Sequence, residues 1–227
     1  MKKLVFATGN KDKMREIRMI MAGLPYEVFS MKEIGVDPEI VEDGTSFAEN
    51  ALIKSRTVAA CIQQAIKSGE VPEKMKEAFE KADAEFAGNH ESDEIVVLAD
   101  DSGLEIDALN KEPGIYSARY LGEDTSYRIK NKNLIDRLEG VPDEKRTARF
   151  VCAVAAVFSN GREEVREATM EGRIGYEEKG ANGFGYDPIL YLPQFGCMSA
   201  ELLPEQKNAI SHRGKALRMM RECLEEA

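Results

Sequence analysis

The sequence predicts a single α/β unit built around a mixed β-sheet. Short apolar runs that end in polar or glycine residues alternate with segments of helical periodicity, which is typical of strand–helix–strand units. A long, mostly apolar stretch over residues 147–158 is followed by Asn160-Gly161, a dipeptide that favours a tight β-hairpin. Strand–helix–strand units and a hairpin in one chain together indicate a sheet with parallel and antiparallel pairing.

The N-terminal part begins with a predicted strand, loop and helix. Residues 4–7 are apolar and run into Thr8-Gly9-Asn10, after which residues 14–24 carry apolar side chains at helical spacing. A second short strand is expected over 26–29. The Ser-x-x-Glu pattern that opens residues 46–66 has the spacing of a capping box, and it predicts the start of a long helix there.

Residues 70–94 differ in character from the rest of the chain. They are strongly acidic, and Pro72 is expected to open a helix that has one narrow apolar stripe. The stripe consists of Met75, Phe79, Ala82 and Phe86, and the helix is expected to end at residues 88–90. We therefore predict a helical segment that lies on the surface and buries a single stripe.

The next predicted strand leads directly to a group of acidic residues. Residues 95–99 form a buried strand that is expected to stop at Asp100-Asp101-Ser102-Gly103, and residues 104–106 are expected to continue the sheet. Asp124 or Thr125 is expected to cap the helix that follows.

The last part of the chain supplies the hairpin, a loop and a helix. The strand over 147–158 is apolar on both faces, as central strands are, and its hairpin partner is expected over 163–169. Residues 180–187 form a glycine-rich loop, and one final helix is expected to carry Ile210 to Leu224. No internal repeat or linker divides the chain.

Composition excludes several classes of protein. The chain has 227 residues, 43% of them hydrophobic, and a net charge of −10, which argues against disorder and against a general nucleic-acid binder. The longest apolar run, 150–158, is far shorter than the ~20 residues of a membrane helix, so no membrane partner is expected. Four widely spaced cysteines indicate reduced thiols in a cytoplasmic protein.

Two stretches that follow predicted strands have the residues for phosphate and metal chemistry. In Thr8-Gly9-Asn10-Lys11-Asp12-Lys13, helix-start amides and Lys13 could hold phosphate oxygens, although an ordinary turn with surface lysines fits the spacing equally. Asp100 and Asp101 could bind Mg²⁺ or orient a water, or they could simply form a turn. In a pleated strand the two side chains would point opposite ways.

Three further features are weaker when taken alone. The glycines at 180–185 surround Phe184, so a flat ring could stack on Phe184 or Tyr186, or the loop could be a flexible turn. Residues 207–215 combine lysine, histidine and arginine at the start of the last helix, which could also be a solvated helix end. Lys54 lies four residues after Asn50, so the two share a helix face, although a lone lysine is usually solvated.

Taken together, these pieces closely resemble the noncanonical purine nucleoside triphosphate pyrophosphatases, also called inosine/xanthosine triphosphate pyrophosphatases. Six motifs occur in the order of that family and cover nearly the whole chain. They are TGNKDK at 8–13, TSFAENALIK at 45–54, ADDSGLEIDAL at 99–109, PGIYSARY at 113–120, GFGYDP at 183–188 and KNAISHRGKAL at 207–217. Each motif is weak alone, but six in register make a specific match.

The resemblance implies a fold and an activity. The fold would be an elongated two-lobed single α/β domain over 1–227, with a long curved mixed sheet and the active site in a cleft between the lobes. The enzyme would use Mg²⁺ to cleave purine nucleoside triphosphates such as dITP, ITP and XTP between the α- and β-phosphates. Its role would be to cleanse the nucleotide pool, and it would be a homodimer.

The resemblance also assigns roles to residues. Asp101 would be the general base and a Mg²⁺ ligand, with support from Asp100, and Lys13 and Lys54 would grip the triphosphate. The predicted substrate-binding residues are Thr8, Gly9, Asn10, Lys11, Asp12, Lys13, Ser102, Phe184, Gly185, Tyr186, Asp187, Lys207, His212 and Arg213. Phe184 would stack on the base, while Arg213, His212 and backbone amides are the candidate donors to its 6-oxo group.

The chain departs from the family pattern in two places. Val41 stands where one of a pair of glutamates is expected, so Glu42 is the predicted second metal ligand, with Asp43 or Glu39 as alternatives. An acidic helical insertion at about 57–94 makes the chain longer than is usual for the family. Two other functions stay open: a pyrophosphatase for modified pyrimidine nucleotides, and a catalytically silent nucleotide sensor, which the Val41 departure favours.

Overall fold

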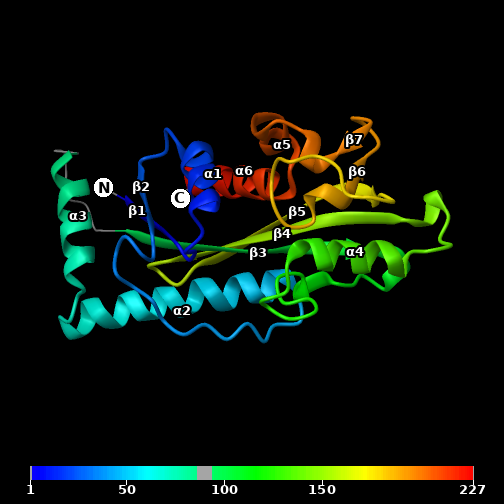
Figure 1. Ribbon diagram of the computed structural model, residues 1–227. Coiled ribbons are helices and arrows are strands. Elements are labelled where there is room, and N and C mark those ends of the chain that lie inside the picture. The colour runs from blue at the N-terminus through cyan, green and yellow to red at the C-terminus, as the bar shows by residue number, and fades with distance from the viewer. Residues whose placement is uncertain (1, 86–93, 227) are drawn as a thin grey trace. The chain divides into compact units, whose positions relative to one another are not determined.

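The computed structural model describes residues 2–85 and 94–226 (Figure 1). The chain divides into two compact units. The first unit consists of residues 1–101, 153–166 and 216–227. The second consists of residues 102–152 and 167–215. Within the described residues, no helix is both long enough and apolar enough to cross a membrane.

The strands form a mixed sheet, as the sequence predicted, and their order in the structure is β2-β1-β3-β4-β5-β6-β7. Strand β1 pairs in parallel with β2 and with β3, whereas β6 pairs antiparallel with β5 and β7. The strands are β1 (Lys2–Phe6), β2 (Tyr26–Ser30), β3 (Ile95–Ile106), β4 (Thr147–Phe158), β5 (Glu163–Ile174), β6 (Leu190–Leu192) and β7 (Cys197–Met198). Strands β3, β4 and β5 each contribute residues to both units.

The described helices are α1 (Lys11–Met21), α2 (Phe47–Ser68), α3 (Glu73–Glu85), α4 (Tyr127–Arg137), α5 (Pro204–Ile210) and α6 (His212–Glu225). Helix α2 begins where the capping pattern predicted, because the Ser46 Oγ accepts a hydrogen bond from the Glu49 N–H at 3.1 Å. The expected cap of α4 at Asp124 or Thr125 was wrong, since that helix begins after Ser126.

The single final helix that the sequence predicted was also wrong, because Ser211 separates α5 from α6. The backbone of Ser211 is extended, with ψ 151°, which interrupts the helical turn. Its hydroxyl accepts a hydrogen bond from the Gly214 N–H at 3.0 Å, as an N-cap side chain does. A serine that can cap a new helix is thus the local reason for the break.

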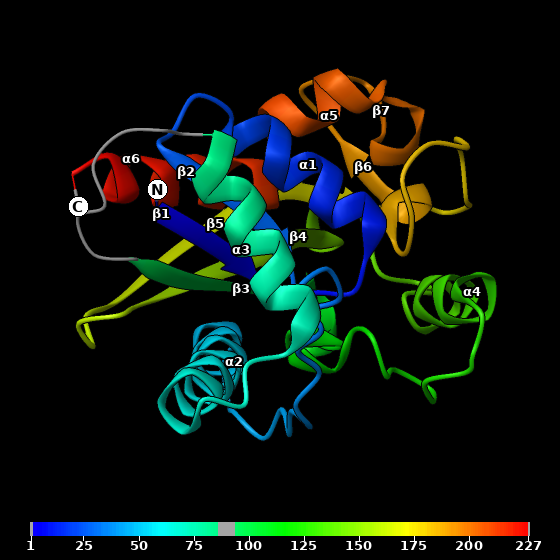
Figure 2. The same ribbon diagram turned by 90° about the vertical axis from the view of Figure 1, so that its left-hand side faces the viewer.

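In the first unit, helices cover both faces of β1 and β3. Figures 1 and 2 show α1 on one side of these strands and α2 on the other. The α2 side is an apolar core in which Val58 and Ile62 of the helix pack with Val97 and Ala99 of β3. This arrangement gives alternate residues of β3 two different environments.

Helix α3 adds its single apolar stripe to the same core. Met75 and Ala82 are buried, and the Phe79 ring lies 5.3 Å from the ring of Phe29. The prediction of one buried stripe on this segment is confirmed for these residues, whereas Phe86 and the expected helix end at 88–90 lie outside the described residues. The proposed insertion at about 57–94 therefore comprises the end of α2 and all of α3.

Strand β3 runs without a break from Ile95 to Ile106, so the expected stop at Asp100–Gly103 was wrong. Adjacent acidic residues usually signal a turn, because buried carboxylates are costly without partners. Here both carboxylates are buried and both have partners, so the backbone stays in the sheet. Because the two carboxylates are paired with lysines inside the protein, the strand does not have to end in a turn that would expose them to solvent.

Candidate active site

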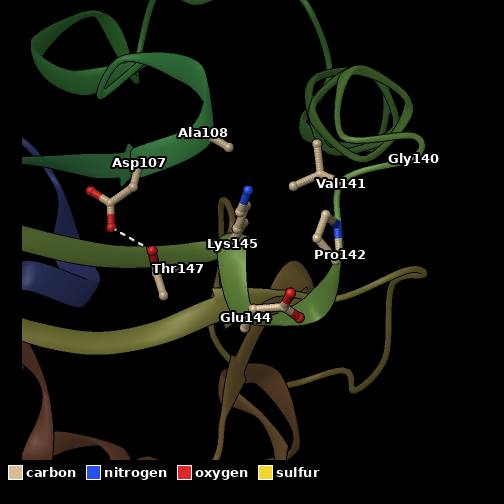
Figure 3. Close-up of a pocket in the computed structure, with 8 residues that line it drawn as sticks. All are labelled: Asp107, Ala108, Gly140, Val141, Pro142, Glu144, Lys145 and Thr147. Atoms are coloured by element: carbon tan, nitrogen blue, oxygen red, sulfur yellow. Dashed lines mark hydrogen bonds between the residues drawn. The ribbon is translucent and has the colours of Figure 1, made fainter.

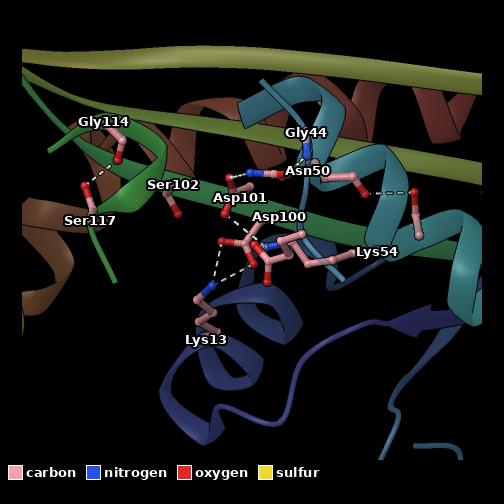
Figure 4. Close-up of polar contacts among 12 residues, drawn as sticks. Lys13, Gly44, Asn50, Lys54, Asp100, Asp101, Ser102, Gly114 and Ser117 are labelled. Atoms are coloured by element: carbon pink, nitrogen blue, oxygen red, sulfur yellow. Dashed lines mark hydrogen bonds and ion pairs between the residues drawn. The ribbon is translucent and has the colours of Figure 1, made fainter. Parts of the chain in front are cut away.

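Asp101 is a buried carboxylate to which the sequence assigned a chemical role. It lies in β3 with 9% of its surface exposed. Its Oδ1 is 3.0 Å from the Nζ of Lys54, and its Oδ2 accepts a hydrogen bond from the Nδ2 of Asn50 at 3.2 Å (Figure 4). Burial raises the pKa of Asp101 above its ordinary value; Lys54 opposes this effect and Glu42 adds to it. A carboxylate in this state is able to accept a proton.

Asp100 has a different lysine. Both of its carboxylate oxygens lie 2.9 Å from the Nζ of Lys13, which α1 supplies (Figure 4). The carboxylate is 1% exposed, so the ion pair is shielded on the Asp100 side. Because successive side chains of a strand point to opposite faces, Asp100 meets α1 while Asp101 meets α2. This confirms the predicted divergence of the two side chains.

Lys54 brings a second carboxylate to Asp101. Its Nζ lies 3.0 Å from an oxygen of Glu42 and 3.0 Å from an oxygen of Asp101. Although burial lowers the pKa of Lys54, these carboxylates raise it above its ordinary value. Two carboxylates that converge on one cation are a donor set that fits a hard divalent cation. In the described ranges, 2–85 and 94–226, no group of three or more His, Cys, Asp or Glu side chains forms such a site.

Asn50 was not among the predicted site residues, although the structure places it at the centre of this group. It is fully buried, donates to Asp101, and accepts the Gly44 N–H at 2.9 Å through its Oδ1. A Cβ at Gly44 would come within 2.6 Å of that oxygen, so the turn before α2 requires glycine. The signal in the sequence was the four-residue spacing between Asn50 and Lys54.

The loop before α1 is organised by its own side chains. The Thr8 Oγ1 accepts the Asn10 N–H at 3.2 Å, and the Asn10 Oδ1 accepts the Lys13 N–H at 3.1 Å. Asn10 thus supplies a hydrogen bond of the kind that an N-cap makes. Gly9, Asn10 and Lys11 are exposed. The side chain of Asp12 lies outside the described part of the structure.

In the second unit, Phe184 is a half-exposed aromatic ring with two cations beside it. The Nζ of Lys207 lies 5.3 Å from the ring centroid, and the guanidinium carbon of Arg213 lies 5.8 Å from it. The ring is 51% exposed. An open ring flanked by donors is suited to stack on a flat polar ligand.

Tyr186 and Asp187 are buried, and they hold this loop from beneath. Asp187 accepts hydrogen bonds from the Phe184 N–H and the Ser199 hydroxyl, both at 2.9 Å, and from the Lys207 ammonium. The Tyr186 hydroxyl donates to the Ser117 carbonyl at 2.7 Å. Glycine is required at 183, where φ is +76° and a Cβ would meet the Asp187 carboxylate at 2.3 Å. The structure thus gives these residues a supporting position.

His212 and Arg213 open α6 and are buried as well. The His212 ring stacks on Phe150 with centroids 4.9 Å apart and planes inclined by 21°. The Arg213 Nη2 donates to the Ser102 Oγ at 3.1 Å. The structure therefore brings Ser102, Phe184, Asp187, Lys207 and Arg213 into one connected group within the second unit.

A hollow of about 540 Å³ elsewhere in the second unit contains no predicted site residue (Figure 3). It is lined by Asp107, Ala108, Gly140, Val141, Pro142, Glu144, Lys145 and Thr147. Asp107, one of its charged side chains, accepts a hydrogen bond from the Thr147 hydroxyl at 2.6 Å.

The fold is an α/β fold with a mixed sheet. The first unit pairs carboxylates with lysines, and the second has an aromatic ring flanked by cations. These features together are typical of an α/β nucleotide-binding protein. A model of the Ham1 family matches residues 4–223, and the chain belongs to this family. A dITP/XTP pyrophosphatase of Desulforamulus reducens is 42% identical over 222 residues, which are 98% of this chain and 95% of that protein.

Solved structures agree with the fold. A HAM1 protein from Coxiella burnetii superposes with a TM-score of 0.79 at 34% identity and is covered over 100% of both chains. A nucleoside-triphosphatase described as a dITP/XTP pyrophosphatase from Mycobacterium abscessus superposes with a TM-score of 0.66 at 36% identity, covering 97% of this chain and 98% of that one.

Proposed function

We propose that this protein is a nucleoside triphosphate pyrophosphatase that hydrolyses dITP, ITP and XTP to the monophosphate and pyrophosphate. The observation that carries the proposal is the buried Asp101, held by Lys54 and Asn50, with Glu42 on the same lysine. Membership of the Ham1 family and the names of its relatives support the same activity.

The reaction needs a base and a set of cations. The oxygen of a water attacks the α-phosphorus, the bond from that phosphorus to the α–β bridging oxygen breaks, and pyrophosphate leaves with the bond electrons. Asp101 takes the proton of the attacking water. Negative charge that shifts onto the phosphate oxygens is stabilised by Lys13 and Lys54. Asp100 holds Lys13 in position through both carboxylate oxygens.

Mg²⁺ is the proposed cofactor, and Glu42 and Asp101 are its proposed ligands. Mg²⁺ prefers oxygen donors and usually keeps waters and substrate phosphates in its remaining positions, so two protein carboxylates are sufficient. When bound, the ion neutralises phosphate charge and polarises the phosphate oxygens. Among the three acidic residues that the sequence left open, Glu42 is favoured because it contacts Lys54.

The purine ring of the substrate is proposed to stack on Phe184 in the second unit. Lys207 and Arg213, which flank the ring, are donors without acceptor capacity, and they suit the oxo groups of hypoxanthine and xanthine. Ser102 follows the proposed general base, Asp101, in the sequence and accepts a hydrogen bond from Arg213. It is proposed to contact the substrate. The net charge of −10 favours a small nucleotide over a polynucleotide partner.

The assembly and location stay predictions. A homodimer is proposed from the resemblance alone, and a cytoplasmic location from the cysteine content. The acidic insertion at about 57–94 has no proposed chemical role.

The test is release of pyrophosphate from dITP, XTP, dATP and dTTP, with Mg²⁺ and with EDTA in its place. We expect rapid Mg²⁺-dependent release from dITP and XTP and little from the other two. Preference for dTTP would indicate the pyrimidine alternative. Binding of dITP without turnover, measured by calorimetry, would indicate the silent sensor.

A further inference from the structure

The backbone carbonyls of residues 184–186 and the Asp187 carboxylate, in the loop that carries Phe184, accept hydrogen bonds from the protein itself. The Phe184 carbonyl accepts the Asp187 N–H at 3.3 Å, and the Tyr186 carbonyl accepts the Ile189 N–H at 3.1 Å. Both carboxylate oxygens of Asp187 also accept hydrogen bonds, as described above. The Gly185 carbonyl, between them, is engaged by a side chain from another element.

That side chain is Asn131 of α4. It is 1% exposed, and its Nδ2 donates to the Gly185 carbonyl at 3.2 Å and to a carboxylate oxygen of Glu178 at 2.7 Å. Both partners accept only, so the orientation of the amide is fixed. Its Oδ1 is buried and has no hydrogen-bond partner among the described residues.

A buried acceptor without a partner costs stability. A leucine at this position would avoid that cost, so the two donors of the amide are the feature that distinguishes Asn131 from an apolar core residue. One donor acts on the loop, and the second anchors the amide to Glu178.

The contact fixes a peptide plane that would otherwise be easy to reverse. Gly185 has φ +68°, in a region that glycine adopts without strain, and no side chain of its own restrains the following peptide. In a planar trans peptide the C=O and the next N–H point in opposite directions. Holding the Gly185 carbonyl toward α4 therefore directs the Tyr186 N–H away from α4.

We propose that Asn131 is a specificity-determining positioning residue, which keeps the Gly185 carbonyl turned away from the purine so that this carbonyl is not presented as an acceptor to a 6-amino group. The inference rests on the proposed function and deepens it. Lys207 and Arg213 beside Phe184 only donate, which suits a 6-oxo purine. A carbonyl acceptor freed beside these donors would accept a hydrogen bond from the amino group of adenine, and the preference for dITP over dATP would fall.

The test compares kcat/KM for dITP and for dATP in the full-length protein. Asn131→Ala removes the donors, and Asn131→Asp keeps the size of the side chain but places a carboxylate against two acceptors. We expect the dITP/dATP ratio to fall by about tenfold in both variants, partly through a gain with dATP. Asn133→Ala is the matched control, because Asn133 lies in the same helix and accepts a hydrogen bond from the Tyr120 hydroxyl at 2.8 Å.

Thermal melting establishes that each variant is folded, and calorimetric binding of dIMP and dAMP gives a readout independent of turnover. If the ratio is unchanged while both kcat/KM values fall together, Asn131 has only a structural role and the inference is overturned. If Asn131→Asp does not fold, Asn131→Ala decides the question in the same way. Failure of the wild type to hydrolyse dITP would instead contradict the proposed function.

Discussion

Asp100 and Asp101 are adjacent in β3, yet their carboxylates are held by lysines from two different helices. Lys13 of α1 contacts both oxygens of Asp100, and Lys54 of α2 contacts Asp101. Each buried charge is thereby compensated separately, which avoids the cost of two neighbouring carboxylates sharing one cation. The two positions can therefore be changed one at a time, and their roles can be separated.

The first prediction concerns the base. Asp101→Asn keeps the size of the side chain and can still contact Asn50, but it cannot accept a proton from water. We expect kcat for dITP to fall by about 10²–10⁴, with a far smaller change in nucleotide binding. Pyrophosphate release measures the first quantity and calorimetry the second. Near wild-type turnover would remove Asp101 from the role of base.

The sequence was sufficient to predict the directions of these side chains but not the length of their strand. Alternation along a pleated strand required Asp100 and Asp101 to diverge, and their contacts confirm it. The strand was expected to stop there, because adjacent carboxylates favour turns unless they are paired. Their lysines lie 87 and 47 positions away, and a local pattern does not contain that information.

The same reason explains why two asparagines were missed. Asn50 contacts Asp101 across 51 positions, and Asn131 contacts Gly185 across 54. For Asn50 the sequence offered only its four-residue spacing from Lys54, and for Asn131 it offered no signal, since the usual partners of an asparagine are local backbone groups or water. The lysines and carboxylates were predicted because their charged side chains indicate a phosphate or metal site. The roles of the two asparagines follow only from their contacts in the structure.

Lys13→Ala tests the phosphate grip. It removes a cation from the triphosphate and leaves Asp100 buried without this lysine, so we expect kcat/KM for dITP to fall by at least about tenfold. Arg15→Ala is the control, because it removes the same charge from an exposed position in the same helix. Equal effects of the two substitutions would mean that Lys13 acts only through the overall field of the protein.

Gly44→Ala tests the turn that Asn50 holds. The added methyl group would lie 2.6 Å from the Asn50 Oδ1 and 2.9 Å from the Glu49 Cβ, so one of these groups must move. We expect the free energy of unfolding to fall by about 1–3 kcal/mol, and kcat to fall because Asn50 also positions Asp101. Urea unfolding and steady-state kinetics measure the two effects. Gly9→Ala, where a Cβ meets no atom within 4 Å and φ is not positive, is the control for the free energy of unfolding, because it removes a glycine without a clash.

The last prediction concerns stability and pH in the second unit. Asp107 accepts hydrogen bonds from Arg149 at 3.0 and 3.1 Å, from Lys111 and from Thr147, and these contacts, Arg149 first, hold the pKa of Asp107 well below its ordinary value. The ionised form is favoured in the folded state, so the stabilisation is full above the unfolded pKa of about 4 and is lost as the pH falls below it.

Asp107→Asn should therefore lower the free energy of unfolding by about 1 kcal/mol at pH 7, and by progressively less as the pH falls below about 4. Urea unfolding of the wild type and the variant, at pH 7 and at a pH below about 4, measures the difference in the free energy of unfolding at each pH. Asp136→Asn is the control, because its single pair with Lys132 is exposed and is expected to contribute little at any pH. A deficit in Asp107→Asn that stays constant with pH would show that the hydrogen-bond geometry, and not the charge of Asp107, stabilises this part of the fold.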